Sequence, residues 1–470
     1  GSNLWRIVVS FALQLLIVRR LGLDALGVYT ISMAYLNVCQ VVSEIGMPAL
    51  LVRDLAQAPQ LRRAYFRLAL TGQLVAALLA WAGLIGLASA LPISDTLRTA
   101  LWLIGASLPF YAFTSATQTL FQAGERMELV MAVEICVNGL ILICSLAVLW
   151  LGGGVLQLMG VIIGTQAVSA ALGWWLLRRS RLIASPQMSV ATTIRDLGRR
   201  VGPFYTLALA DVLLQRIDLL LLSVIAGEAV AGVYSAAYNL VRVLLKVVQS
   251  FLQALYPTLS RLRRQAQAHY RQVTDLSLRS ALMILAPVAA LVWVGADGLL
   301  GLVYGERYPA TVPVLQILIW TTLSALLAGF ASMVFLVEQR PRRSLLITGV
   351  NLAALILLLP WLTGVAEATG AAWALALAGA GSAVAGIALA RAANLPVDWV
   401  RLALLFGVIV GAVAVALALP GPALLRAGVG MVCYLLLLGL TRQVTPADWR
   451  LLRRALGRDK PLPDKARDGQ

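Results

Sequence analysis

The sequence predicts an all-α integral membrane protein with about fourteen transmembrane helices, grouped as two six-helix lobes and two C-terminal helices. Of the 470 residues, 60% are hydrophobic and only 13% are charged. Charge-free apolar stretches recur along the chain at the length of about 20 residues that a helix needs to cross a bilayer. An internal repeat is the third observation, and it indicates the two lobes.

The internal repeat is clearest in two segments that lie 205 positions apart. Gly27-Val28-Tyr29 recurs as Gly232-Val233-Tyr234, and Gly22 recurs as Gly227. Two further echoes follow in the same order: Phe121–Arg126 resembles Phe335–Arg340, and Val137-Asn138 matches Val350-Asn351. Each repeat contains an even number of expected spans, so a pseudo-twofold axis along the membrane normal should relate the lobes, with substrate sites between them.

The expected spans follow the apolar stretches in chain order. The first lobe (1–177) should hold spans 4–19, 28–51, 65–91, 98–123, 128–150 and 156–177. After a linker (178–201), the second lobe (202–391) should hold spans 202–225, 230–256, 276–303, 311–337, 344–363 and 367–390. Segment 392–441 adds spans 401–419 and 423–441, and 442–470 forms a tail.

The linker and the tail are each expected to carry an amphipathic helix at the membrane surface. In the linker, apolar residues alternate with basic ones: Met188, Val190, Ile194 and Leu197 against Arg195, Arg199 and Arg200. In the tail, Thr445-Pro446 is typical of a helix start, and Trp449 and Arg450 begin a similar pattern. Residues 457–470 are polar and are expected to be disordered.

The net charge of +17 reflects membrane topology rather than nucleic-acid binding. The even-numbered expected loops and the tail hold 27 Lys and Arg residues, whereas the odd-numbered loops hold five. The positive-inside rule then places both termini in the cytoplasm. Basic loops on that side should also contact anionic lipids of the membrane.

Nothing in the sequence favours an enzyme. The longest expected outside loop, 296–310, is too short for an extracytoplasmic catalytic domain, and His269 is expected to be solvated in a cytoplasmic loop. Cys39, Cys136, Cys144 and Cys433 fall within spans, where cysteine usually acts as a small buried hydrophobe. We find no pattern for a metal site, a cofactor, a phosphate-binding glycine loop or a disulfide framework.

The eighth span carries the clearest functional pattern. Its polar residues are spaced 3, 4, 3 and 4 positions apart and share one helical face: Asn239, Arg242, Lys246, Gln249 and Gln253. Charges in a bilayer cost at least about 2.5–3.5 kcal/mol each and usually face a water-filled cavity. The other interpretation is that these polar side chains only form hydrogen bonds with neighbouring helices. Two cations one turn apart repel each other, however, and this favours a nearby anion or water.

The second span is the repeat partner of the eighth and is also polar on one face. Thr30, Asn37, Gln40 and Glu44 share that face. The 205-residue shift aligns Asn37 with Arg242 and Glu44 with Gln249, so the charges differ between the two lobes.

The first and seventh spans complete the predicted cavity. Arg216, Arg242 and Lys246 could bind phosphate groups, and Asn239, Gln249, Asn37 and Gln40 could bind sugar hydroxyls. Glu44, Asp211 and Asp218 are candidates for coupling to H⁺ or Na⁺. Arg6 and Arg53 are expected near the cytoplasmic side, as headgroup anchors or gating residues.

Several motifs together resemble the Wzx-type oligosaccharide flippases of the multidrug/oligosaccharidyl-lipid/polysaccharide exporter superfamily. The opening of the chain carries Arg20-Leu21-Gly22, Gly27-Val28-Tyr29, Gly46 and Arg53. The second lobe carries Asp218, Gly232, Tyr234, Ala237 and the segment Tyr304–Tyr308 followed by Val314-Leu315. Each motif alone is weakly specific, but their joint order extends over nearly the whole chain.

This resemblance implies a V-shaped transporter of fourteen helices that alternates between inward-facing and outward-facing states. It implies that the substrate, an undecaprenyl-pyrophosphate-linked oligosaccharide, moves to the outer leaflet of a prokaryotic cell membrane. It further implies coupling to a proton or sodium gradient. We expect a monomer, with a polysaccharide polymerase complex as a candidate partner.

Three alternatives stay open at this point. A drug/ion antiporter of the same superfamily would share the fold, but its first span would more naturally carry an acid. A lipid II flippase would also favour a cationic cavity and fourteen spans. A membrane polysaccharide polymerase or ligase would be an enzyme, and the short outside loops argue against it.

Overall fold

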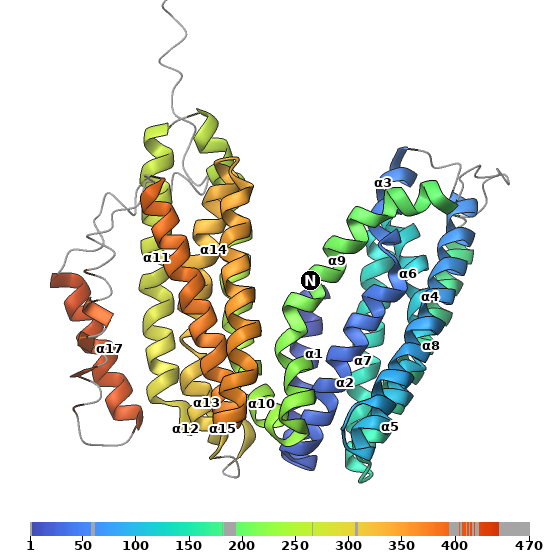
Figure 1. The fold of residues 1–470 in the computed structure, drawn as a ribbon, viewed down its shortest axis with the longest axis horizontal. Helices are drawn as coiled ribbons and strands as arrows, with labels where there is room; N and C mark the ends of the chain where they lie inside the picture. Colours follow the sequence, from blue (N-terminus) through green and yellow to red (C-terminus); the bar gives the residue numbers. More distant parts are fainter. Residues whose placement is uncertain are drawn as a thin grey trace, which may run out of the picture. The chain divides into compact units, whose positions relative to one another are not determined.

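A computed structural model describes residues 2–57, 62–180, 182, 194–265, 267–305, 309–393 and 423–440, with scattered positions between 404 and 418. All regular elements in this part of the chain are helices (Figure 1), which confirms the all-α class. Within the described residues, eight helices are long and apolar enough to cross a membrane. Span 401–419 lies largely outside the described residues, so the number fourteen stays a prediction.

The chain forms two compact units, and the boundaries between them fall inside two helices, Gly227–Gln265 and Pro341–Ala392. Unit 1 comprises Gly1–Ala236 and Thr363–Ala371, and unit 2 comprises Ala237–Leu362 and Ala372–Gln470. Unit 1 therefore extends beyond the expected first lobe. The lobe boundaries inferred from the repeat stay predictions.

Unit 1 contains nine helices in its described part and the start of a tenth. They are α1 (Ser2–Leu21), α2 (Leu23–Glu44), α3 (Met47–Gln57), α4 (Arg62–Ala90), α5 (Asp95–Gly105), α6 (Leu108–Ala123), α7 (Met127–Trp150), α8 (Val155–Ser180), α9 (Ile194–Ile225) and the start of α10 (Gly227–Gln265). A core cluster joins α3, α4, α6 and α8 through residues such as Leu50, Phe66, Phe121 and Leu177. The rings of Phe66, Phe113 and Trp174 extend it, with centroids 5.8 to 6.5 Å apart.

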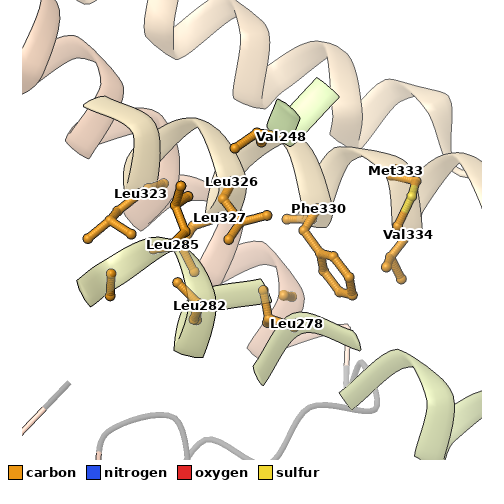
Figure 2. Packing of buried hydrophobic residues seen from close by; sticks show 14 of the residues in the cluster. Val248, Leu278, Leu282, Leu285, Leu323, Leu326, Leu327, Phe330, Met333 and Val334 are labelled. Atoms are coloured by element: carbon orange, nitrogen blue, oxygen red, sulfur yellow. The ribbon is translucent and has the colours of Figure 1, made fainter. Parts of the chain in front are cut away.

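Unit 2 contains the rest of α10 and six further helices in its described part. These are α11 (Gln267–Val294), α12 (Ala296–Tyr304), α13 (Thr311–Leu318), α14 (Thr321–Val337), α15 (Pro341–Ala392, apart from its segment Thr363–Ala371, which belongs to unit 1) and α17 (Ala423–Leu440). Non-helical backbone angles at Ala366 and Glu367 divide α15 near the boundary expected between two spans. Figure 2 shows the core, where Leu282 and Leu285 of α11 pack with Leu326 and Phe330 of α14.

Several sequence expectations need correction or lie outside the described residues. His269 belongs to α11 rather than to a loop, although it is exposed as expected. Cys136 is exposed rather than buried. Met188 and Val190 of the expected linker helix, and the whole tail, are not described, whereas residues from Ile194 onward already form α9.

The repeated segments Phe121–Arg126 and Phe335–Arg340 form the same backbone turn. The N–H of Arg126 donates to the carbonyl oxygen of Phe121, and the N–H of Arg340 donates to that of Phe335, both at 2.8 Å. Glu125 and Gln339, one position earlier, have φ angles of 57° and 59°. These are the features of a Schellman helix end, so the sequence echo marks a conserved local geometry within the chain.

The second span differs from its repeat partner in one important respect. α2 ends at Glu44, Ile45 and Gly46 have positive φ angles, and α3 resumes at Met47. The 205-residue shift places the equivalent positions inside α10, which is helical throughout. The single span expected at 28–51 is therefore a broken helix.

Candidate functional site

The two copies of the Gly-Val-Tyr motif pack directly against each other within unit 1. A Cβ atom on Gly27 would lie 1.9 Å from the carbonyl oxygen of Glu228, and one on Gly232 would lie 2.0 Å from that of Leu23. Leu23 and Glu228 are themselves 205 positions apart, so the contact is reciprocal. Only glycine permits this approach of the α2 and α10 backbones, which explains why both copies keep it.

The polar face of α2 begins beyond this contact. The side-chain amide of Asn37 donates to the carbonyl oxygen of Met33 in its own helix at 2.5 Å. Gln40 is half-buried, and Glu44 is the last residue of α2. Of these predicted residues, Glu44 makes the most extensive contacts with other helices.

Glu44 lies among polar groups of α4 and α6. Tyr111 Oη and Ser115 Oγ, one turn apart on α6, donate to Glu44 Oε1 at 2.7 and 3.1 Å. From α4, Gln73 Nε2 lies 3.5 Å from the backbone carbonyl oxygen of Glu44. Arg6 of α1 interacts electrostatically with Tyr111, which connects it to the same cluster rather than to the lipid headgroups alone.

The two candidate acids of α9, Asp218 and Asp211, differ in burial and in their hydrogen-bond partners. Asp218 is only 6% exposed. Its Oδ2 accepts from Tyr234 Oη at 3.0 Å, its Oδ1 accepts from the backbone N–H of Leu219 at 2.8 Å, and Arg216 interacts with it electrostatically. Asp211 is exposed and accepts from Gln215 Nε2 at 2.8 Å. Asp218 thus joins α9 to α10, whereas Asp211 lies on the surface of unit 1.

The polar stripe of α10 changes from buried to exposed along the helix within unit 2. Asn239 is 4% exposed, and its Nδ2 has no hydrogen-bond partner among the described residues. Arg242 is half-buried and interacts electrostatically with Tyr304 at the end of α12. Lys246 Nζ donates to Gln249 Oε1 at 2.9 Å, and both residues are exposed on unit 2.

Arg53 lies on α3 and contacts a neighbouring acid of its own helix and an aromatic ring of α9. It forms an ion pair with Asp54 at 3.1 Å, and its guanidinium lies over the ring of Phe204 at 5.5 Å from the ring centroid. The sequence reasoning did not identify Tyr111, Ser115, Gln73 or Tyr304 as site residues. The i, i+4 spacing of Tyr111 and Ser115 would have placed both on one face of a helix, but only the fold brings them to Glu44.

A sequence model of a family described as polysaccharide biosynthesis protein matches residues 16–313. A search of functionally curated proteins finds no matching sequence.

Solved structures show the same fold at low sequence identity. The lipid II flippase MurJ in an inward closed conformation is 12% identical, with a TM-score of 0.68 over 94% of this chain and 97% of that one. An inward-facing multidrug resistance transporter of the MATE family and MOP superfamily is 14% identical, with a TM-score of 0.64 over 82% and 94%. The MATE transporter DinF-BH is 17% identical, with a TM-score of 0.57 over 84% and 95%. At these identities the likeness concerns the fold.

Proposed function

The chain belongs to the polysaccharide biosynthesis protein family that residues 16–313 match, and on this premise we propose that it is a flippase for lipid-linked oligosaccharides. Its family and its fold are those of flippases and transporters rather than enzymes. The proposed substrate is an undecaprenyl-pyrophosphate-linked oligosaccharide. It would move from the cytoplasmic to the outer leaflet of a prokaryotic cell membrane, with both termini of the protein in the cytoplasm.

The observation that carries this proposal is the polar stripe of α10. Arg242 and Lys246 put two cations one turn apart on a helix that is apolar enough to cross a membrane. A guanidinium binds phosphate oxygens in a bidentate manner, and an ammonium adds a point charge, so the pair suits a pyrophosphate. Nδ2 of Asn239, one turn before Arg242, has no hydrogen-bond partner in the described part of the chain and provides a buried donor for a phosphate or hydroxyl oxygen.

The second candidate function is the flipping of lipid II. The match to the lipid II flippase MurJ covers 94% of this chain and supports the second candidate through the fold. Both candidates share a polyprenyl-pyrophosphate anchor, and the α10 cations would serve either. The attached sugars and the peptide of lipid II distinguish the two substrates.

The test is flipping by the purified chain in proteoliposomes. Fluorescent undecaprenyl-pyrophosphate oligosaccharide and fluorescent lipid II are supplied in the outer leaflet in separate experiments, and translocation is followed by protection from a membrane-impermeant quencher. We expect the oligosaccharide lipid to be flipped and lipid II to be flipped slowly or not at all. Faster flipping of lipid II would favour the second candidate, and flipping of neither would contradict the proposed function.

The same assay tests the drug-exporter alternative and the proposed partners. Export of an organic cation such as rhodamine 6G in place of lipid flipping would identify a drug exporter. We propose a polysaccharide polymerase complex as a partner, and flipping by the chain alone would show that this partner is not required for transport. We propose that the transporter works as a monomer in contact with anionic lipids.

A further inference from the structure

The break between α2 and α3 creates a polar site inside unit 1 that lacks a counterpart in the second repeat. The break ends α2 at Glu44, and the carbonyl groups at the C-terminal end of a helix carry a partial negative charge. Broken helices of membrane transporters bind small cations at such carbonyl ends. In this chain, the end coincides with an acid, because Glu44 is the last residue of α2.

The acid is found only on the broken helix. The 205-residue shift aligns Glu44 with Gln249, which lies on the continuous helix α10 and carries no charge. The helix break and the carboxyl group therefore occur together in one repeat and are both missing from the other. Their joint occurrence suggests that the helix break and the carboxyl group form one site.

The groups around Glu44 can accommodate both states of its carboxyl group. The hydroxyls of Tyr111 and Ser115 donate to Oε1 and stabilise the carboxylate, and Arg6 adds a positive charge beyond Tyr111. Burial and the negative end of α2 act in the opposite direction and favour the neutral acid. Among the described residues, Tyr111 and Arg6 are titratable and charged groups that interact at this site, and α4 contributes the amide of Gln73.

The side-chain amide of Gln73 lies beside the backbone of Glu44. Gln73 is 0% exposed, and its Nε2 points to the carbonyl oxygen of Glu44. Its Oε1 finds no hydrogen-bond donor among the described residues. An unpaired buried polar atom costs about 1–3 kcal/mol, so this site lacks a donor. Protonation of a carboxylate creates such a donor.

We propose that Glu44 is the proton-binding residue of this transporter, with Tyr111 and Ser115 holding its carboxyl group and Gln73 contacting its backbone carbonyl oxygen at the α2–α3 break. This inference rests on the proposed function for its role in coupling, but not for proton binding itself. One proton is exchanged: it leaves water, bonds to a carboxylate oxygen of Glu44 and is later returned to water. Asp218 is a weaker candidate, because both of its oxygens already accept hydrogen bonds from neighbouring groups.

The break also connects the protonation of Glu44 to the packing of the backbone. A Cβ atom on Gly46 would lie 2.7 Å from the backbone nitrogen of Tyr205 on α9, so the break and α9 are in close contact. A change in the hydrogen bonds of Glu44 therefore acts two residues from a tight helix contact. The proton would bias the packing of α9 against the α2–α3 break.

The direct test is a pH titration of the purified protein by infrared difference spectroscopy. We expect a carboxylic acid C=O band that titrates in the wild type and disappears in Glu44→Gln. The matched control is Glu134→Gln, which neutralises another half-buried acid of unit 1 on α7 and should keep the band. Tyr111→Phe should move the titration midpoint, because it removes a donor to the carboxylate. An unchanged band in Glu44→Gln would overturn the proposal.

A transport experiment separates this proposal from the proposed function. In proteoliposomes, a pH gradient should change the rate of flipping by the wild type and by Glu134→Gln, whereas Glu44→Gln should flip at one rate with or without the gradient. Stimulation of the wild type by a sodium gradient alone would contradict proton coupling. If the wild type flips no substrate, the proposed function fails, and the infrared band still decides whether Glu44 binds a proton.

Discussion

Thr30 and Ser235 occupy equivalent positions in the two repeats, and their hydroxyl oxygens share a hydrogen bond at 3.0 Å. They lie three residues beyond Gly27 and Gly232, which make the reciprocal backbone contact. Equivalent residues can touch each other only at a local twofold axis, so this axis passes between α2 and α10 at the Gly-Val-Tyr motifs. The polar stripes of both helices start one to two turns beyond it.

Alanine at the glycine contact should destabilise the protein. Gly27→Ala and Gly232→Ala each place a Cβ atom about 2 Å from a backbone carbonyl oxygen, which forces α2 and α10 apart. We expect each to lower the free energy of unfolding by about 1–3 kcal/mol, measured as a lower Tm in detergent. The double variant should cost less than the sum, because the first substitution already separates the helices.

Gly83→Ala is the control for these substitutions. Gly83 lies on α4 with open space where its Cβ would be, so alanine there should leave stability unchanged or raise it. Equal losses at Gly83 and Gly27 would contradict the reciprocal contact.

Cysteines at positions 30 and 235 should form a disulfide on mild oxidation. The background for this test replaces the four natural cysteines by alanine. We expect Thr30→Cys/Ser235→Cys to cross-link in high yield, because the two Oγ atoms are already 3.0 Å apart. A protease site introduced between the repeats allows the cross-link to be read on a gel. Ser32→Cys/Ser235→Cys is the matched pair, since Ser32 points to another face of α2, and equal yields from both pairs would refute the contact.

The phenol of Tyr234 should contribute more to stability than that of Tyr35. Both tyrosines are buried in unit 1, but Tyr234 donates to the carboxyl group of Asp218, whereas Tyr35 shares a hydrogen bond with the hydroxyl of Ser223. Hydrogen bonds to charged groups contribute about 1.5–3 kcal/mol, and neutral ones about 0.5–1.5 kcal/mol. Thermal unfolding of Tyr234→Phe and Tyr35→Phe measures the difference, and a larger loss for Tyr35→Phe would show that Asp218 gains little from the bond.

The sequence predicted the all-α class and the repeated Gly-Val-Tyr motifs, because both are visible in local sequence signals. Hydropathy locates apolar spans, and the 205-residue shift identified Gly27 and Gly232 as equivalent. The division of α15 at Ala366 and Glu367 was also expected from the end of an apolar stretch.

The break at Ile45 was missed, although Gly46 and Pro48 directly after it are residues that often mark a helix end. Ile45 is apolar and β-branched, which rarely accompanies a positive φ angle, and the surrounding stretch reads as one continuous span. The partners of Glu44 were missed for another reason. Tyr111 and Ser115 are 67 and 71 positions away, so only the packing of α2 against α6 brings them together.

Removal of the α10 cations should abolish flipping without unfolding the protein. Arg242→Ala and Lys246→Ala remove the groups that would neutralise a pyrophosphate, and neither side chain is fully buried in unit 2. Arg261→Ala is the matched control, because it removes an exposed cation from the same helix about four turns further on, outside the predicted binding stripe. The measurement is the initial rate of flipping in proteoliposomes, with Tm confirming that each variant folds.

Arg242→Lys should keep more activity than Arg242→Ala, since it retains the charge but loses the bidentate geometry. Wild-type rates for both alanine variants would contradict a role of this stripe in binding, whereas an equal loss in Arg261→Ala would indicate that general charge, not the stripe, is what matters.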